Sequence, residues 1–461
     1  EKVILGMSDH TDIFCLDEVG RYFDIPIEPV IVRESELLEV LDTSYGESEN
    51  IASLVEEIND DLGEELLDID EMLESADEDE APVTKLLLKI FEEAIKYNAS
   101  DIHIEPDEKV LRIRQRIDGV LAEQVLNEKR VAAALVVKLK LMSSLDISEK
   151  RIPQDGRFNL KVHTQNIDVR ISTMPVQHGE SVVMRILLLD DGVKNLDEVG
   201  MDATTVAQFR QTITHPHGLV LVTGPTGSGK TTSLYAALSE LNTPDKKIIT
   251  VEDPVEYRLP RLSQVQINTK IGLDFAKVLR ATLRQDPDVL LVGEIRDAES
   301  AEIALRAAMT GHLVLSTLHT NDAISSALRL IDMGVDPFLV ASSLKTIVAQ
   351  RLVRRLCESC KEPMTADHQY DYLLSETQKQ ATFYQAKGCV HCLNTGYKGR
   401  LGAFEYLNVS EDMAAALREG NISRFTDIAT ASTGYKTLRE SALDIALSGE
   451  TSLDEVQRIT V

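Results

Sequence analysis

Short apolar runs alternate with amphipathic stretches through the second half of the chain. Continuous apolar runs predict buried strands at 219–222, 247–251, 288–294 and 311–321, and helix-forming residues follow the first of them at 234–241. Buried strands that alternate with helical stretches are typical of a parallel sheet with helices on both faces. The pattern predicts an α/β domain, in which ligands bind beyond the carboxyl ends of the strands.

A different pattern begins at Pro82. A broad apolar stripe at 86–95 predicts a helix that ends near Asn98. Alternating apolar and polar residues predict strands at 100–105, 109–117, 120–125, 168–172 and 181–186. Asp118-Gly119 is a hairpin signal between two of these strands. These elements indicate a second, separate domain.

Residues 1–46 form a smaller unit. Strands are expected at 3–5 and 27–32, with helices around 13–22 and 34–41. So short a segment buries too little apolar surface to fold comfortably alone. We therefore expect it to be the C-terminal part of a larger N-terminal domain.

The formal charge of −28 belongs mainly to one segment of the chain. Residues 34–84 contain 20 Asp and Glu and no Lys or Arg, whereas the rest of the chain carries 48 basic and 56 acidic residues. This density of like charge favours a solvated acidic linker at 47–81, although its apolar residues also permit transient docking of a partly helical segment. Because non-specific nucleic-acid binding needs clustered Lys and Arg, the balance argues against a nucleic-acid partner.

The sequence carries no signal for export or for membrane insertion. No run of 18 apolar residues occurs, and the first residues lack the basic and apolar regions of a signal peptide. Four of the five cysteines lie between 357 and 392, unlike the spread of a secreted disulfide framework. A cytoplasmic protein is expected.

A phosphate-binding loop follows the first predicted strand. Gly224-Pro225-Thr226-Gly227-Ser228-Gly229-Lys230-Thr231, with Thr232 next, satisfies the pattern G-x-x-x-x-G-K-[ST] in full. Glycines let backbone N–H groups approach phosphate oxygens at a helix N-terminus. Lys230 is expected to meet the terminal phosphates of ATP, and the hydroxyl of Thr231 to bind Mg²⁺.

Candidate catalytic side chains end three of the predicted strands. Glu252 and Asp253 follow the strand at 247–251, Glu294 ends the strand at 288–294, and His319 ends the strand at 311–321. The carboxylates are candidates for orienting the attacking water, and the sequence does not decide between Glu294 and Glu252. A carboxylate is usual at the end of such a strand, where this chain has Gly293. We therefore expect Glu294 to contribute more to orienting the water. A lone histidine is more often part of a core, but the strand-end position of His319 favours a role in sensing the γ-phosphate.

The cysteines form two C-x2-C pairs, Cys357 with Cys360 and Cys389 with Cys392, separated by 28 residues. Four thiolates at such spacing suit a tetrahedral Zn²⁺ with a structural role. Paired disulfides are the alternative, which a reducing cytosol disfavours. We expect about one zinc ion per chain.

Four of these segments together resemble a known family. The residues 224–231, 251–256, 293–297 and 311–322 are similar to the Walker A, Asp box, Walker B and His box of the bacterial type II secretion and type IV pilus assembly ATPases. The segments 24–30 and 100–106 resemble the end of the first and the start of the second N-terminal domain of that family.

The resemblance implies an α/β multidomain fold. A RecA-like P-loop ATPase domain at 200–461 would include a zinc-binding subdomain at 357–392 and C-terminal helices. A PAS-like α+β domain at 82–190 would precede it, joined by a linker at 191–199, and residues 1–46 would be the remnant of an N-terminal α/β domain.

The resemblance also implies a homo-hexameric motor at the cytoplasmic face of the inner membrane, where it hydrolyses ATP to drive pseudopilus assembly and protein export. Its partners would be the cytoplasmic domain of a membrane-anchored secretion protein, bound through the N-terminal domain, an inner-membrane platform protein and acidic phospholipid. In the family, arginines reach the phosphates, in cis or across a subunit boundary, and the matching positions here are Arg170, Arg185, Arg280 and Arg284.

Other functions remain open at this point. A type IV pilus assembly ATPase shares every motif described above. A DNA-translocating motor should show a basic channel, which the acid excess disfavours. A nucleotide-gated scaffold with little turnover is a third possibility, against which the intact Lys230 and Glu294 count.

Overall fold

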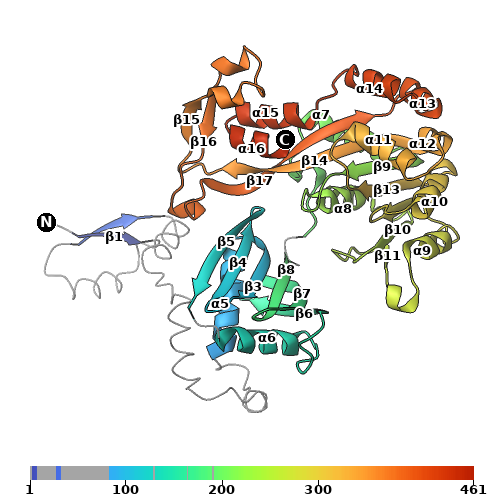
Figure 1. Cartoon of the computed structure of the whole chain (residues 1–461). Coiled ribbons are helices and arrows are strands. Elements are labelled where there is room, and N and C mark those ends of the chain that lie inside the picture. The colour runs from blue at the N-terminus through green and yellow to red at the C-terminus, as the bar shows by residue number, and fades with distance from the viewer. Residues whose placement is uncertain are drawn as a thin grey trace. The chain divides into compact units, whose positions relative to one another are not determined.

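The computed structural model describes residues 3–7, 27–32, 82–127, 130–162, 165–188 and 192–460. The chain divides into two compact units, Glu1–Leu188 and Leu189–Val461 (Figure 1). The helices expected around 13–22 and 34–41 and the acidic linker expected at 47–81 lie outside the described residues. The predicted N-terminal strands are confirmed as a parallel pair, β1 (Val3–Met7) and β2 (Ile27–Ile31).

The first unit also contains a six-stranded sheet whose neighbouring strands are all antiparallel, in the order β5-β4-β3-β8-β7-β6. Its strands are β3 (Ala99–Pro106), β4 (Leu111–Ile117), β5 (Val120–Leu126), β6 (Gln154–Val162), β7 (Gln165–Val176) and β8 (Gly179–Leu188). The helices α5 (Pro82–Lys96) and α6 (Arg130–Met142) pack on this sheet. This arrangement is the expected α+β domain.

The alternation of residues along these strands explains the two faces of the sheet. Ile102, Ile104 and Ile113 are buried against the helices, where they share a core with Phe91 and Leu135. The neighbouring positions His103, Arg112 and Arg114 alternate with them and are less buried, so the face opposite the helices is polar, as expected for a sheet with one buried side.

The second unit is built on a seven-stranded sheet in the order β11-β10-β12-β13-β9-β14-β17. The first six strands of this order are parallel, and β17 pairs antiparallel with β14. The strands are β9 (Gly218–Thr223), β10 (Ile248–Glu252), β11 (Ser263–Gln266), β12 (Val289–Val292), β13 (Leu313–Leu318), β14 (Leu344–Leu356) and β17 (Tyr397–Asn408). A separate small antiparallel pair joins β15 (Glu362–Thr365) and β16 (Thr382–Gln385).

Helices cover both faces of the large sheet, as the apolar runs predict. The helices are α7 (Ala203–Ile213), α8 (Lys230–Leu241), α9 (Phe275–Thr282), α10 (Ala298–Met309), α11 (Ala323–Asp332), α12 (Pro337–Ser343), α13 (Glu411–Arg418), α14 (Ile422–Thr430), α15 (Leu438–Leu447) and α16 (Leu453–Thr460). Along β9, Val220 and Val222 pack with α7 and α8, whereas Leu219 and Leu221 belong to the core formed with α9 to α14. The α/β prediction is confirmed.

In the described part of this unit, aspartate side chains begin five α-helices. Asp202, Asp274, Asp297, Asp322 and Asp336 each accept hydrogen bonds from backbone N–H groups in the first turn of the following helix. Such caps satisfy donors that have no partner within the helix, typically for about 1 kcal/mol each. Asp297 and Asp322, which belong to the Walker B and His box segments, therefore have a structural task.

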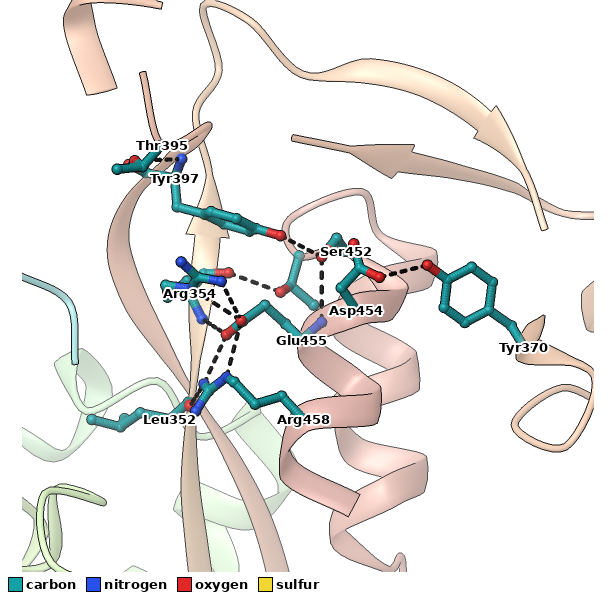
Figure 2. Close-up of polar contacts among 10 residues, drawn as sticks. Leu352, Arg354, Tyr370, Thr395, Tyr397, Ser452, Asp454, Glu455 and Arg458 are labelled. Carbon is teal, nitrogen blue, oxygen red and sulfur yellow. Dashed lines mark hydrogen bonds and ion pairs between the residues drawn. The ribbon is translucent and has the colours of Figure 1, made fainter. Parts of the chain in front are cut away.

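The long strand β14 was not predicted from the sequence. It runs beside β17 (Figure 1), and the register of this pair shifts between Arg354 and Leu356. Near this point the buried Glu455 carboxylate of α16 accepts hydrogen bonds from Arg354 and Arg458, which lie on either side of it (Figure 2). The two cations offset the cost of burying this charge. Because Arg354 belongs to β14 and Glu455 to α16, these contacts hold the C-terminal helix against β14.

Among the described residues, no helix combines the length and the apolar character needed to cross a bilayer. The C-terminal helices expected within 200–461 correspond to α13, α14, α15 and α16.

Candidate active site

The phosphate-binding loop joins the end of β9 to the start of α8. Gly229 takes a φ of 86°, a left-handed conformation that suits glycine, and is the N-cap of α8. The loop residues 225–227 are exposed, as is Thr231, whereas Ser228 is buried. The exposed loop thus ends at a helix N-terminus, where backbone N–H groups favour anions.

Lys230 lies across this loop. Its ammonium group donates to the carbonyl oxygens of Gly224 at 2.7 Å and Pro225 at 3.0 Å. Burial lowers the pKa of Lys230 to about 8, with Glu294 acting in the opposite direction and Arg351 in the same direction. The charge of this lysine is therefore poorly solvated, and a polyanion bound at the loop would favour its protonated form.

Glu252 ends β10 and is buried beneath α8. The Tyr235 hydroxyl donates to one carboxylate oxygen at 2.6 Å, and the Thr250 hydroxyl donates to the other at 2.5 Å. Burial raises the pKa of Glu252, while these two hydrogen bonds lower it. A raised pKa makes a carboxylate a stronger proton acceptor.

The surroundings of Gly293 leave little space for a side chain, which explains why this position of the Walker B segment carries no carboxylate. A Cβ atom at Gly293 would lie 3.2 Å from the Val251 carbonyl oxygen and 3.3 Å from the Glu252 Cα. The end of β10 therefore occupies the space that a side chain at position 293 would need. The Asp box supplies a carboxylate beside this strand end in the form of Glu252.

Glu294 connects several of the predicted residues at the carboxyl edge of the sheet. Its carboxylate forms a close ion pair with Arg296 and lies 3.5 Å from the His319 Nε2. The Arg296 guanidinium in turn lies 3.9 Å from Asp253. His319 is half-exposed, so it is not a core histidine. The structure thus brings together Glu294, His319 and Asp253, and Glu294 also acts electrostatically on Lys230.

The predicted arginines of the second unit have other neighbours. Arg280 on α9 forms a close ion pair with Glu299 on α10, and Arg284 donates to the Arg280 carbonyl oxygen at 2.8 Å. Both side chains are exposed. None of their contacts in the described part of the chain involves the phosphate-binding loop.

The predicted arginines of the first unit lie on the polar face of its sheet. Arg170 on β7 is the direct cross-strand neighbour of Arg157 on β6 and of Arg185 on β8. Arg185 donates to Asp101 at 3.2 Å, and Arg157 forms a close ion pair with Asp168. Three arginines on adjacent strands form a row that two carboxylates flank, an arrangement suited to an anionic ligand.

The four predicted cysteine ligands come together in the second unit. All four Sγ atoms lie within 4.8 Å of one another. The Sγ atoms of Cys357 and Cys389 are 3.8 Å apart, as are those of Cys360 and Cys392, and no pair is bonded as a disulfide. Thiolates about 2.3 Å from a tetrahedral zinc ion would be about 3.8 Å from one another, so the donor set fits zinc.

Three polar residues around the site were not predicted from the sequence. Arg296 lies within the Walker B segment and could have been found from its place beside Glu294. Gln350 and Arg351 lie on β14, and no motif marks them. Gln350 accepts a hydrogen bond from Ser233 of α8 at 2.8 Å, and Arg351 donates to Asn321, two residues after His319, at 3.0 Å.

Comparison with known proteins shows the family of the chain. Residues 76–458 match the family described as "Type II/IV secretion system protein". The chain belongs to this family, and it is an ATPase. It is 45% identical over 476 residues to the type II secretion system protein E of Klebsiella pneumoniae, which covers 99% of this chain and 94% of the relative.

Two further relatives of this secretion ATPase show the range of the family. The type IV pilus assembly ATPase PilB of Myxococcus xanthus is 43% identical, over 99% of this chain and 82% of its own length. The crystal structure of the pilus retraction motor PilT with bound ADP matches with a TM-score of 0.56 and 25% identity, over 81% of this chain and 96% of that protein. The RecA-like multidomain fold expected from the sequence is thereby confirmed.

Proposed function

We propose that this chain is the ATPase of a type II secretion system, in which ATP hydrolysis drives pseudopilus assembly and protein export. The observation that carries the proposal is the identity of 43–47% to relatives named as type II secretion proteins from several bacteria, each over more than nine-tenths of this chain. The alternative, a type IV pilus assembly ATPase, is supported by the similar identity to PilB.

We propose that residues 224–232 bind ATP. Backbone N–H groups of the loop and the ammonium group of Lys230 would neutralise the phosphates, and the exposed Thr231 hydroxyl would help to hold Mg²⁺. The ion, when bound, neutralises charge that develops on the phosphoryl oxygens. Positioning and charge neutralisation supply most of the catalysis in phosphoryl transfer, which suits a site composed mainly of fixed backbone donors and cations.

The two candidate carboxylates have different surroundings, and we assign them different tasks. Glu252, with its raised pKa, would orient the attacking water and accept its proton. Glu294 would hold Arg296 and His319 in place at the sheet edge, close to Asp253, so that these two side chains face the γ-phosphate.

The pH dependence of turnover tests this assignment. A general base must be deprotonated, so activity is lost as the pH falls through the raised pKa of Glu252. Removing the Tyr235 hydroxyl removes a hydrogen bond that lowers this pKa. We expect Tyr235→Phe to move the acid limb of the kcat profile to higher pH, whereas Glu294→Gln lowers kcat and leaves the limb in place.

A matched comparison sharpens the pH experiment. Tyr372→Phe removes the hydroxyl of an exposed tyrosine far from β10 in sequence and should leave the profile unchanged. An acid limb at the same pH in wild type and Tyr235→Phe would contradict the role of Glu252. Wild-type turnover in both Glu252→Gln and Glu294→Gln would contradict the assignment of either carboxylate.

We propose that Arg170, Arg185, Arg280 and Arg284 complete the site around the γ-phosphate. The row of Arg157, Arg170 and Arg185 and the exposure of Arg280 and Arg284 support binding of an anion by these groups. The dependence of ATP turnover on protein concentration distinguishes arginines that act within one chain from arginines that act across a subunit boundary.

We propose that the four cysteines hold a structural Zn²⁺. The spacing of their Sγ atoms supports this, as do two backbone N–H groups, of Cys389 and Gly396, that donate to the Cys392 sulfur at 3.2 and 3.1 Å. With four protein ligands the ion would have no open position for catalysis.

The assembly and its place in the cell also belong to the proposal. We propose a homo-hexamer at the cytoplasmic face of the inner membrane, which binds the cytoplasmic domain of a membrane-anchored secretion protein through its N-terminal domain. A platform protein and acidic phospholipid would be the other contacts at the membrane, and no nucleic acid is involved.

Deletion of the gene in the source bacterium tests the proposed function. We expect exported enzymes to accumulate inside the cell envelope while surface pili remain, and we expect the wild-type gene, but not Lys230→Ala, to restore export. Loss of pili with intact export would instead establish the pilus-assembly alternative. Loss of neither would contradict both.

A further inference from the structure

Strand β14 runs past the end of β9 and along the phosphate-binding loop. The pairing of β14 with β9 ends at Ala349 and Thr223, so Gln350 and Arg351 are the next two residues of β14 and lie beside the start of the loop. On its other side β14 remains paired with β17, with Gln350 opposite Phe404 and Arg351 opposite Ala403. A strand that is still paired on one side therefore presents two polar residues to the loop.

Gln350 lies against both ends of the phosphate-binding loop. A Cβ atom at Gly224 would be 2.5 Å from the Gln350 carbonyl oxygen, and one at Gly229 would be 2.7 Å from the Gln350 Nε2. The buried Gln350 side chain is itself held by the hydroxyl of Ser233, which donates to its Oε1 at 2.8 Å. Two glycines of the loop are thus needed because Gln350 fills the space beside them.

Arg351 links the loop region to the segment that follows His319. Its Nη1 donates to the Gln350 carbonyl oxygen at 3.1 Å and would lie 3.2 Å from a Cβ atom at Gly224. Its Nη2 donates to the Asn321 carbonyl oxygen at 3.0 Å and to the Asn321 Oδ1 at 3.2 Å. One guanidinium group therefore bonds both to Gln350, which lies against the phosphate-binding loop, and to the segment that follows His319.

The far end of β14 is fixed independently of the nucleotide site. Arg354 donates from its backbone N–H and its guanidinium to the buried Glu455 carboxylate, and Arg458 donates to that carboxylate and to the Leu352 carbonyl oxygen (Figure 2). The Thr451 hydroxyl donates to the Arg354 carbonyl oxygen at 2.8 Å. Because α16 holds residues 352–354 in this way, Gln350 and Arg351 have a firm support.

We propose that Arg351, supported by Gln350, is a positioning residue for ATP hydrolysis that holds the phosphate-binding loop and the His319 segment at a fixed separation. The planar guanidinium can bond to Gln350 and Asn321 at the same time, which a lysine ammonium at the same position cannot reproduce. The inference rests on the proposed role of the loop and of His319 in hydrolysis.

The test measures kcat and KM for ATP, with Mg²⁺ present, in the full chain. Arg351→Ala is expected to lower kcat at least about 10-fold, since small displacements of catalytic groups are costly, with a smaller change in KM. Arg351→Lys, which keeps the charge, should not restore kcat. Arg355→Ala is the matched control, because Arg355 lies on the same strand and forms an exposed ion pair with Glu450.

A double-mutant cycle distinguishes positioning from a general loss of structure. If Arg351 acts through the His319 segment, Arg351→Ala combined with His319→Ala should lower kcat little further than His319→Ala alone. Thermal midpoints of all variants are measured in parallel. Should Arg351→Ala fail to fold, Arg351→Lys and its combination with His319→Ala carry the same test.

Three results would overturn the inference: kcat of Arg351→Ala within twofold of wild type, full rescue by Arg351→Lys, or additive effects in the cycle. Lys230→Ala is measured alongside, so that failure of the inference about Arg351 can be distinguished from failure of the proposed function. The inference alone fails if wild type hydrolyses ATP, Lys230→Ala does not and the Arg351 variants behave as wild type. The proposed function of the loop fails if Lys230→Ala retains wild-type turnover.

Discussion

ATP turnover is expected to fall at least about 100-fold when Lys230 is replaced by alanine, because one positioned charge in a water-poor site contributes this much to a developing anion. The Lys230 ammonium group is buried and held by two loop carbonyl groups, so it needs little reorganisation to meet a phosphate. The fold should survive, since a buried lysine with a lowered pKa contributes little as a charge to stability. Steady-state turnover and the thermal midpoint provide the measurement.

The pH profile gives this prediction a second signature. The pKa of Lys230 is lowered to about 8 in the free protein. Since kcat/KM reports the free enzyme, it should decline above about pH 8, whereas kcat should decline only at higher pH, because bound ATP favours the protonated lysine. The control is Lys436→Ala, which removes an exposed lysine paired with Asp444 and should leave both profiles unchanged. Turnover in Lys230→Ala close to that of wild type would refute the role of this residue.

Loss of the cysteine cluster is expected to give the largest change in stability. Replacing Cys389 and Cys392 by serine should remove the zinc ion and lower the free energy of unfolding of the second unit by about 3 kcal/mol or more, a fraction of the roughly 10–16 kcal/mol that zinc contributes in small zinc domains. The cluster closes a segment whose Tyr370 and Phe383 belong to the core shared with α15 and α16. Loosening it should also expose this core.

Elemental analysis and thermal unfolding together check the cysteine prediction. Wild type should carry about one zinc ion per chain and the double variant none, with a thermal midpoint lower by at least about 6 °C, at 2–4 °C per kcal/mol for a unit of this size. Cys15→Ser is the control, because Cys15 stands outside both C-x2-C pairs in the sequence. Wild type without zinc, or a double variant with unchanged zinc content, would be incompatible with the metal site.

Local patterns were sufficient to predict the elements that carry the motifs. The strand-loop-helix unit around Lys230 was predicted because an apolar run, a glycine-rich turn and a helix-forming stretch are each short-range signals. The strands that end near Glu252 and Glu294 were found in the same way, since strands buried on both faces read as continuous apolar runs. Their meeting at one edge follows from the parallel order of the sheet.

The strand β14 could not be predicted from the sequence, because its conformation depends on tertiary pairing. In β14 the apolar residues Leu344, Val348, Leu352 and Leu356 recur every four positions, a spacing that also suits a helix. Only the pairing of this segment with β9 and β17 makes it a strand, so Gln350 and Arg351 could not be placed at the loop from sequence. For the same reason the space that Gly293 leaves for the end of β10 was visible only in the structure.

The measurement that tests the central claim most directly is ATP turnover per chain in the presence of Mg²⁺, over a wide range of protein concentration, for wild type and Lys230→Ala. The exposed Arg280 and Arg284 have no contact with the loop in the described residues, so we expect sites to be completed on assembly. Specific activity of wild type should therefore rise with concentration to a plateau, and Lys230→Ala should stay inactive throughout. Turnover that is absent in wild type at every concentration, or equal in the two proteins, would contradict an ATP-hydrolysing motor built on this loop.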